Sequence, residues 1–104
     1  MPSQHPRHDL NELLTNGVRL SIAAALQEVE KAEFGLIRDL VEITNPALSK
    51  HVATLEAAGY LEVEKGRVGR RPRTWLRLTN SGREALKRHM SALSHIATFA
   101  TPHA

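Results

Sequence analysis

The stretch at residues 44–61, TNPALSKHVATLEAAGYL, combines helical apolar spacing with an uncommon polar side. Three apolar side chains fall at i, i+4 and i+7 and are expected to face a core: Leu48, Val52 and Leu55. The other side carries small, polar and basic residues, with no acid before Glu56. Small side chains permit close approach to another surface, and Ser, Asn, His and Lys donate hydrogen bonds to phosphates or base edges. An ordinary solvated helix face is the alternative interpretation.

A second concentration of charge lies downstream, in residues 65–77, KGRVGRRPRTWLR. This segment holds six basic residues and no acid. Without these six, the chain has 8 basic residues (14 minus 6) against 11 acidic ones, so the rest of the chain is mildly acidic. Such a local excess of positive charge indicates a polyanionic partner.

The arginines of this segment divide into two groups. Arg73 and Arg77 share a predicted strand face with Trp75. Glu62 and Glu64 are expected opposite them on the neighbouring strand, so ion pairing is as good an expectation for these two arginines as contact with a ligand. The arginines between the strands have no acid nearby, so phosphate or minor-groove contact is the better expectation for them. They are Arg67, Arg70 and Arg71.

Apolar periodicity predicts the helices that position these residues. They cover residues 18–28, 35–42 and about 46–58, after a short first helix that is capped by Asp9 and runs through Leu10, Leu13 and Leu14. Thr44 or Asn45 is expected to cap the third of the longer helices, and Gly59 to end it. In the 35–42 helix, the side chains expected to face inward are Leu36, Leu40 and Val41.

Alternating and capping patterns predict the remaining elements. A short extended piece at 32–34 and strands at 60–65 and 73–78 are expected, with the turn bracketed by Gly66 and Gly69. Ser81-x-x-Glu84 has the spacing of a capping box and opens a last helix, which runs through about residue 97. The chain is therefore predicted to have a flexible N-terminal tail (1–8), one domain (9–97) that ends in a helix over about 80–97, and a C-terminal tail (98–104).

The ordered set of these motifs resembles winged helix-turn-helix transcriptional regulators of the MarR, ArsR and PadR kind, especially small stand-alone DNA-binding proteins of bacteria and archaea. The matching elements, within about residues 16–97, are Ser49-x-His51, Leu55-Glu56, Gly59-Tyr60-Leu61, the arginine-rich wing, Leu78-Thr79 and Gly82-Arg83. The resemblance implies a mainly α fold with a small β-hairpin wing (α+β), built from a three-helix core and a C-terminal dimerisation helix. It also implies a homodimer on double-stranded operator DNA, with the third helix in the major groove and the wing, residues 65–73, on the minor groove or phosphates.

The resemblance implies that the polar side of the third helix and the basic wing both contact DNA. On the third helix they are Asn45, Ala47, Ser49, Lys50, His51 and Thr54, and on the wing Lys65, Arg67, Arg70, Arg71 and Arg73. We expect Ala47, Lys50 and His51 to lie nearest the bases.

The last helix carries apolar residues at i, i+4, i+7 and i+11, which predicts a dimer seam; packing on its own domain is the alternative. The predicted dimerisation residues are Leu10, Leu13, Leu14, Leu86, Met90, Leu93, Ile96 and Ala97.

Other classes of site find little support in the sequence. The chain has no cysteine and lacks the Cys or dense His and Asp clusters of metal-sensing ArsR proteins, so we predict no disulfide and no metal site. It has no nucleophile elbow, phosphate loop or HExxH motif, so we expect neither an enzyme nor a cofactor. No apolar run approaches the roughly 18 residues of a membrane span, and the start lacks the apolar region of a secretory signal.

These absences predict a cytoplasmic protein with no membrane contact, associated with the nucleoid while it binds DNA. A small-molecule effector stays open. A winged-helix protein-interaction module and a non-specific DNA-binding protein are the alternative functions.

Overall fold

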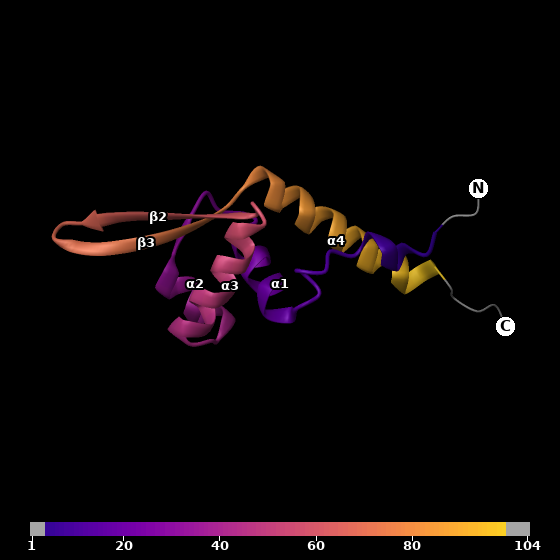
Figure 1. Cartoon of the computed structure of the whole chain (residues 1–104), viewed down its shortest axis with the longest axis horizontal. Coiled ribbons are helices and arrows are strands. Elements are labelled where there is room, and N and C mark those ends of the chain that lie inside the picture. Colours follow the sequence, from indigo (N-terminus) through magenta and orange to yellow (C-terminus); the bar gives the residue numbers. More distant parts are fainter. Residues whose placement is uncertain (1–3, 100–104) are drawn as a thin grey trace.

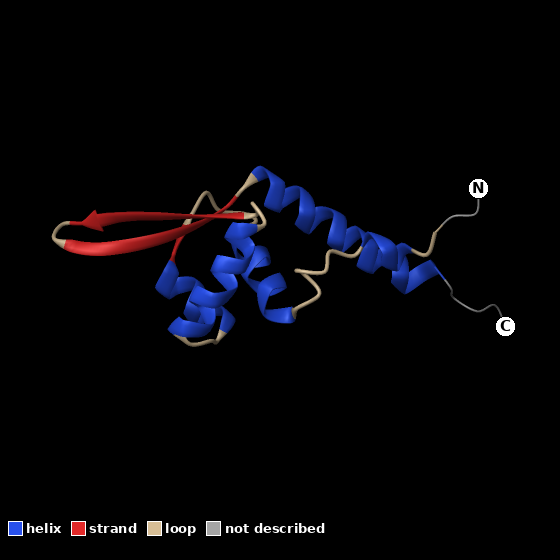
Figure 2. Ribbon diagram, viewed as in Figure 1, coloured by secondary structure: helices blue, strands red, loops and turns tan. Residues whose placement is uncertain are grey.

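The computed structural model describes residues 4–99 and divides them into five helical segments and three strands (Figures 1 and 2). In chain order they are η1 (Pro6–Asp9), α1 (Gly17–Leu26), β1 (Ala32–Glu33), α2 (Phe34–Val41), α3 (Asn45–Ala57), β2 (Leu61–Val68), β3 (Arg71–Leu78) and α4 (Asn80–Phe99). The strands form an antiparallel sheet in the order β1-β3-β2. The predicted fold is therefore confirmed: three helices, a hairpin with one short added strand, and a C-terminal helix.

One hydrophobic core joins the three helices to the base of the hairpin. Its fully buried side chains include Ile22, Leu26, Ile37, Leu48, Leu55, Leu61 and Leu76. Burying each of these side chains contributes about 1.5–3 kcal/mol. Because the hairpin enters this core only at its base, its outer half extends away from the domain (Figure 1).

Polar side chains and one glycine set the boundaries of α1 and α3. The Asn16 side chain accepts two hydrogen bonds, each 3.0 Å, from backbone N–H groups in the first turn of α1. Thr44 Oγ1 accepts the N–H of Ala47 at 3.2 Å, so Thr44 rather than Asn45 caps α3. Gly59 has φ +80° just beyond the end of α3, as the sequence predicted.

The segment before α1 differs from the prediction. The residues after Asp9 form turns instead of a helix, because the Asn11 side chain accepts the N–H groups of Leu13 and Leu14 at 3.0 and 3.3 Å. Asn11 also donates its own N–H to His89 Nδ1 at 3.0 Å, which ties the segment to α4. The 3-10 helix η1 lies within the predicted N-terminal tail and runs beside α4 (Figure 1), whereas residues 1–3 lie outside the described residues.

Helix α2 buries a different face from the predicted one. Ile37 is buried and Val41 is partly buried, whereas Leu36 and Leu40 are 54% and 62% exposed. Successive helical residues are rotated by about 100°. Once Ile37 and Val41 face the core, Leu36 and Leu40 must turn outward, and the prediction that they face inward is wrong.

Helix α4 begins at Asn80, so its cap lies two residues before the predicted one, and it continues to Phe99, while residues 100–104 lie outside the described residues. Thr79 Oγ1 accepts the N–H of Gly82 at 3.0 Å and donates to the Gly59 carbonyl at 2.6 Å, so Thr79 replaces Ser81 as the cap. A Cβ on Gly82 would lie 2.1 Å from the carbonyl oxygen of Tyr60. Glycine is therefore required where α4 crosses the base of the hairpin.

The protomer is elongated, with extents of 64 × 25 × 22 Å and a radius of gyration of 16.3 Å. A compact chain of this length has a radius of gyration of about 13 Å. The hairpin projects at one end, and η1 with the later turns of α4 projects at the other (Figure 1). Among residues 4–99, no helix is long and apolar enough to cross a membrane.

Candidate nucleic-acid interface

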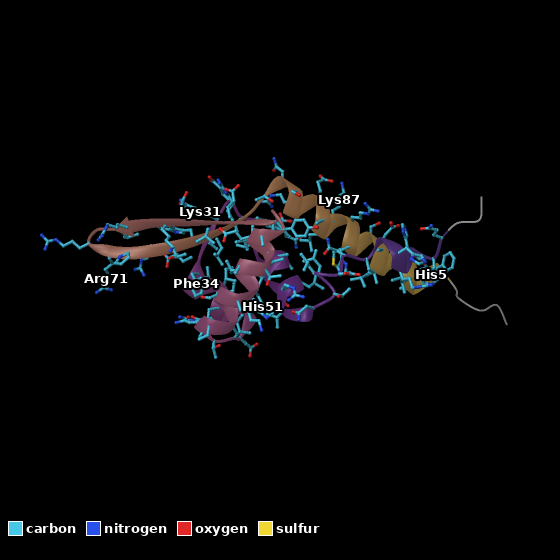
Figure 3. The ribbon with its side chains drawn as sticks, in the orientation of Figure 1. His5, Lys31, Phe34, His51, Arg71 and Lys87 are labelled. Carbon is cyan, nitrogen blue, oxygen red and sulfur yellow. The ribbon has the colours of Figure 1, made fainter. Side chains whose placement is uncertain are left out.

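Helix α3 directs its apolar row into the core and its polar side outward, as the sequence predicted. Ser49 and Lys50 are exposed. His51, which is labelled in Figure 3, is partly exposed. Ser49 lines the groove between α3 and the wing, whereas His51 contacts a side chain of α1. The predicted DNA contacts on α3 therefore form a band that crosses the helix from the α1 side to the wing side.

The partner of His51 is Arg19, from the first turn of α1. Arg19 Nη1 lies 3.3 Å from His51 Nδ1, and Arg19 Nε donates to the Leu13 carbonyl at 2.7 Å. Partial burial, followed by the positive charges of Arg19 and Lys50, lowers the pKa of His51 below its ordinary value. The imidazole is therefore neutral at pH 7.

Two other polar residues of α3 are held by neighbours. Asn45 Oδ1 accepts from Arg38 Nη1 at 3.0 Å, and this leaves the Asn45 amide N–H groups as donors. Arg38 Nε also donates to Asp39 Oδ1 at 2.8 Å, which lowers the pKa of the Asp39 carboxyl. Thr54 Oγ1 donates to the Lys50 carbonyl at 3.2 Å.

Arg19 and Arg38 also contribute to this surface, although no pattern in the sequence predicted them. Each contacts a residue on another helix, so neither leaves a periodic or spacing signal in its own segment.

A groove of about 1160 Å³ lies between α2, α3 and the hairpin. On the hairpin side it is lined by Lys65, Pro72 and Arg73, and on the α3 side by Ser49 and Glu56. Charges of both signs thus face this groove.

The wing is a paired hairpin almost to its tip. Cα pairing runs from Leu61↔Leu78 to Val68↔Arg71 and leaves a two-residue turn, Gly69-Arg70, with Gly69 at φ +64°. The sequence placed the turn between Gly66 and Gly69, but Gly66 lies inside β2. A Cβ there would sit 2.9 Å from the Trp75 ring, so this glycine makes room for the indole.

The outer cations of the wing are exposed. Lys65 and Arg67 lie on β2, and Arg70 lies in the turn. Arg71, which is labelled in Figure 3, begins β3. None of these four side chains forms an ion pair with another described residue. Arg67 Nη1 donates to the Arg70 carbonyl at 3.3 Å, across the turn. These cations are therefore available to an external anion.

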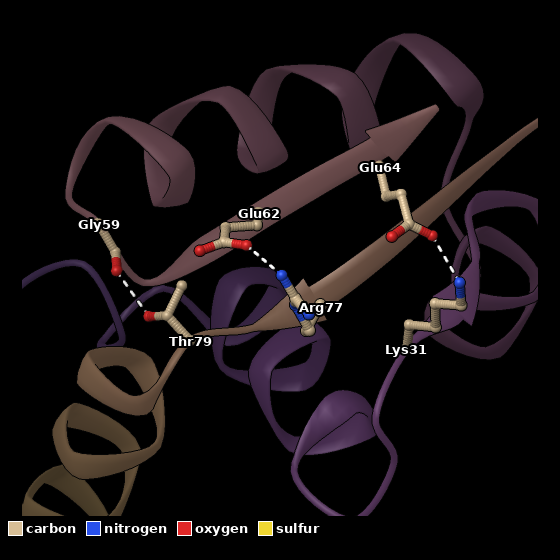
Figure 4. Close-up of polar contacts among 6 residues, drawn as sticks. All are labelled: Lys31, Gly59, Glu62, Glu64, Arg77 and Thr79. Carbon is tan, nitrogen blue, oxygen red and sulfur yellow. Dashed lines mark hydrogen bonds and ion pairs between the residues drawn. The ribbon is translucent and has the colours of Figure 1, made fainter. Parts of the chain in front are cut away.

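The inner arginines have carboxylate partners within the fold. Arg77 pairs with Glu62 across the hairpin (Figure 4), which was one of the two expectations. Arg73 Nε lies 3.9 Å from Glu33 Oε1, so its partner comes from β1 and not from the hairpin glutamates.

The remaining hairpin glutamate, Glu64, binds a lysine from outside the hairpin. Lys31 Nζ donates to Glu64 Oε2 at 2.5 Å, and this bond lowers the pKa of the Glu64 carboxyl (Figure 4). The same ammonium lies 4.8 Å from the centre of the Trp75 ring, within the range of a cation–π contact. Trp75 is therefore covered by a basic side chain on the inner half of the hairpin.

The residues predicted to form a dimer seam fall into three groups. Leu14 and Leu86 are 1% and 3% exposed and belong to the protomer's own core, so they offer almost no surface to a partner. Met90 and Leu93 are 49% and 38% exposed, and Ala97 on the same stripe of α4 is also exposed. The partly buried members are Leu10, Leu13 and Ile96.

The described histidine and acidic side chains do not form a cluster of metal ligands. Among residues 4–99, no three His, Cys, Asp or Glu side chains come close enough together to hold a metal ion.

Similarity to known proteins agrees with this geometry. A family described as winged helix DNA-binding domain matches the chain over residues 18–97. An uncharacterised protein of Methanocaldococcus jannaschii is 30% identical over 79 residues, which cover 76% of this chain and 86% of that protein.

Two solved structures extend the comparison. A transcriptional regulator homologue from Pyrococcus horikoshii has a TM-score of 0.84 and 29% identity, and the match covers 96% of this chain and 100% of that one. The S. aureus MepR–DNA complex has a TM-score of 0.71 and 15% identity, over 89% of this chain and 79% of that one, and shares the fold.

Proposed function

Because this chain belongs to the winged helix DNA-binding domain family, we propose that it is a homodimeric transcriptional regulator that recognises a specific DNA sequence. Membership in that family confirms the resemblance stated from the sequence, and it sets the chain among DNA-binding proteins and apart from enzymes. The observation that carries the proposal is the polar side of α3 beside a wing whose outer cations have no carboxylate partner within residues 4–99.

Helix α3 has the size and surface of a recognition helix. Its 13 residues span about 20 Å, and the major groove of B-DNA, about 12 Å wide, admits one helix. Ala47 and Ser49 are small enough to permit close approach, whereas Lys50 and His51 supply donors for phosphates or base edges. In the proposed complex, α3 lies in the major groove.

The wing supplies the sequence-independent part of the affinity. Each phosphate that a Lys or Arg neutralises releases condensed counterions, so binding weakens as salt rises. The paired strands hold Arg67, Arg70 and Arg71 on a stiff arm, which lowers the entropy cost of placing them on the flanking backbone. In the proposed complex, the wing lies on the minor groove or phosphates beside α3.

A second copy of the chain is the proposed partner of α4. Met90, Leu93 and Ala97 form an exposed apolar stripe on a helix that projects from the core, and a second copy would bury it. The radius of gyration of the single chain, 16.3 Å, is larger than the about 13 Å of a compact chain of this length, which also supports pairing with a second copy. For such a dimer to bind DNA, its two α3 helices would have to reach half-sites about 34–36 Å apart, or a multiple of that distance.

The test is a fluorescence anisotropy titration of the purified protein into two labelled duplexes at several salt concentrations. One duplex comes from the region upstream of the protein's own gene, and the other is a scrambled sequence of equal composition. We expect an affinity at least about 10³-fold tighter for the first duplex and a steep decrease with salt.

The other outcomes separate the alternatives. Steep salt dependence without a sequence preference would indicate a general DNA-binding protein, once duplexes from other promoters have been tested. No binding at low salt would contradict the DNA-binding role of this surface and favour a protein-interaction module.

A further inference from the structure

One histidine of the proposed recognition surface is held by a side chain from a different helix. Arg19 bridges α1 and α3: its Nη1 lies 3.3 Å from His51 Nδ1, and its Nε donates to the Leu13 carbonyl at 2.7 Å. The backbone of Arg19 is fixed as well, because its N–H donates to the Asn16 cap at 3.0 Å. Arg19 is therefore held by one hydrogen bond at its backbone and by another at its guanidinium, besides the contact with the ring.

This arrangement determines which ring nitrogen of His51 carries the proton. A guanidinium only donates hydrogen bonds, so the nitrogen that faces Arg19 must be an acceptor with a free lone pair. Neutral imidazole has one N–H, which is then on Nε2. The charges around the ring agree, since burial and the positive charges of Arg19 and Lys50 lower the pKa of His51 and keep it neutral at pH 7.

We propose that Arg19 is a positioning residue for DNA recognition, which holds His51 as the Nε2–H tautomer so that the ring donates one hydrogen bond to an acceptor on DNA. The inference rests on the proposed function, because it names a determinant of that same surface.

The acceptor is a phosphate oxygen or an acceptor on a base edge, such as purine N7, guanine O6 or thymine O4. A ring in this state rejects donors, such as the cytosine amino group. Arg19 therefore affects sequence preference without being required to touch a base.

The first test needs no DNA. Long-range ¹H–¹⁵N spectra of the imidazole nitrogens distinguish the two tautomers of His51 in the labelled wild-type protein and in Arg19→Ala. We expect Nε2–H in the wild type at about pH 7.5, and in the variant a mixture of tautomers with a raised His51 pKa. Arg7→Ala is the matched control, because it removes one exposed positive charge in η1, next to α4 and away from α3, and should leave the spectrum unchanged.

A wild-type ring with its proton on Nδ1, or an Arg19→Ala spectrum identical to the wild type, would overturn the inference. Circular dichroism verifies that the variant is folded. If Arg19→Ala does not fold, Arg19→Gln serves instead: its side chain is two atoms shorter and carries no charge, so it should release the ring and give the same mixture of tautomers and raised His51 pKa.

The second test is a double-mutant cycle on DNA affinity. If Arg19 acts through His51, Arg19→Ala and His51→Ala each weaken specific binding by about tenfold, and the double variant binds no worse than His51→Ala alone. Additive losses would show that Arg19 contacts DNA independently, which contradicts a positioning role. A wild type that binds no DNA would overturn the proposed function, while the spectra still decide whether Arg19 sets the tautomer.

Modified duplexes identify the acceptor. A His51→Ala penalty that disappears when one purine is replaced by its 7-deaza analogue assigns the bond to a base N7. A penalty that disappears at one methylphosphonate linkage assigns it to a phosphate oxygen. A penalty that no single base or phosphate modification removes would contradict a direct bond from His51.

Discussion

The two ends of this protein expose surfaces of opposite physical kind. The outer wing presents Lys65, Arg67, Arg70 and Arg71, none of them in an ion pair within residues 4–99. The projecting part of α4 presents an apolar stripe instead. Unpaired cations attract a polyanion, whereas exposed apolar area attracts another apolar surface. The comparison supports the proposal that one chain has two partners, DNA at the wing and a second copy at α4.

The region between the two ends shows that this contrast is not a general property of the chain. There, Arg77 pairs with Glu62. Arg83 Nη2 donates to the Val29 carbonyl at 3.0 Å, just beyond the end of α1. Where η1 meets α4, Arg88 Nη2 lies 2.9 Å from Asp9 Oδ1. These arginines have acceptors inside the protein, whereas the four cations of the outer wing have no carboxylate partner within residues 4–99.

The largest effect is expected from placing charge on the apolar stripe of α4. Met90→Glu with Leu93→Glu should give monomers in sedimentation, because two acids on each copy would have to be buried in the seam. Specific DNA affinity should fall by at least about 100-fold, since each monomer then holds a single half-site. Leu86→Glu would not test this point, because Leu86 lies in the core and the variant would unfold.

Ser91→Glu with His95→Glu is the matched control for the seam. These two residues are exposed on the opposite side of α4, and this variant should remain a dimer. If Met90→Glu with Leu93→Glu also sediments as a dimer, the dimer seam lies elsewhere. The apolar stripe of α4 would then not be a binding surface for a second copy.

The next largest effect is expected on stability, at the point where α4 crosses the base of the hairpin. Gly82→Ala should lower the free energy of unfolding by about 2 kcal/mol, because the new methyl group would meet the Tyr60 carbonyl at the base of the hairpin. Gly17→Ala is the control, since a Cβ there has no atom within 4 Å. Urea unfolding of both variants measures the difference, and equal stabilities would mean that α4 and the hairpin move apart at little cost.

Much of this arrangement was predictable because its signals are local. The polar side of α3 follows from the i, i+4, i+7 row of Leu48, Val52 and Leu55, and the end of the helix from Gly59. The hairpin follows from the alternation around Leu61 and Val63. Each pattern lies within a few residues of the feature it predicts.

What the sequence did not predict depends on contacts between distant residues. Within α2, the rows Leu36/Leu40 and Ile37/Val41 are equally apolar, and only packing against the other elements decides between them. The turns after Asp9 depend on the bond from Asn11 to His89, 78 residues away. The link between Arg19 and His51 likewise joins residues 32 positions apart.

A smaller effect is expected at the wing. Arg70→Ala with Arg71→Ala should weaken binding to every duplex by about tenfold at low salt. The slope of log affinity against log salt should decrease by about 1.8 per bound copy, or about 3.6 for the dimer, which corresponds to two phosphate contacts in each wing. Anisotropy titrations at four salt concentrations measure both quantities.

The control for the wing removes the same charge at the opposite end. Arg7→Ala with Lys87→Ala deletes two exposed positive charges on η1 and α4 and should leave the slope unchanged. Equal slopes for the wing variant and the wild type would remove the wing from the DNA interface and leave α3 as the only contact.

The smallest effect is a pH dependence at the α4 end. His89 is 1% exposed and its Nδ1 accepts the Asn11 N–H, and burial lowers its pKa, opposed in part by a hydrogen bond with the Leu14 backbone. The folded protein therefore resists a proton that the unfolded chain takes up near its ordinary pKa of about 6.5. The unfolded state binds more protons in this range, so stability must fall as the pH decreases through about 6.5 towards the lower folded pKa.

Each unit of pKa lowering corresponds to about 1.4 kcal/mol of stability lost on full protonation. We expect the urea midpoint of the wild type to decrease between about pH 7.5 and 5.5, and that of His89→Gln to decrease less. His51, whose pKa is also lowered, acts in the same direction, so His51→Gln measures its separate share. Parallel curves for His89→Gln and the wild type would show that the buried ring does not couple acid to stability. A shallower curve for His89→Gln would show that protonation of this buried ring, which accepts the Asn11 N–H, carries part of the loss of stability in acid.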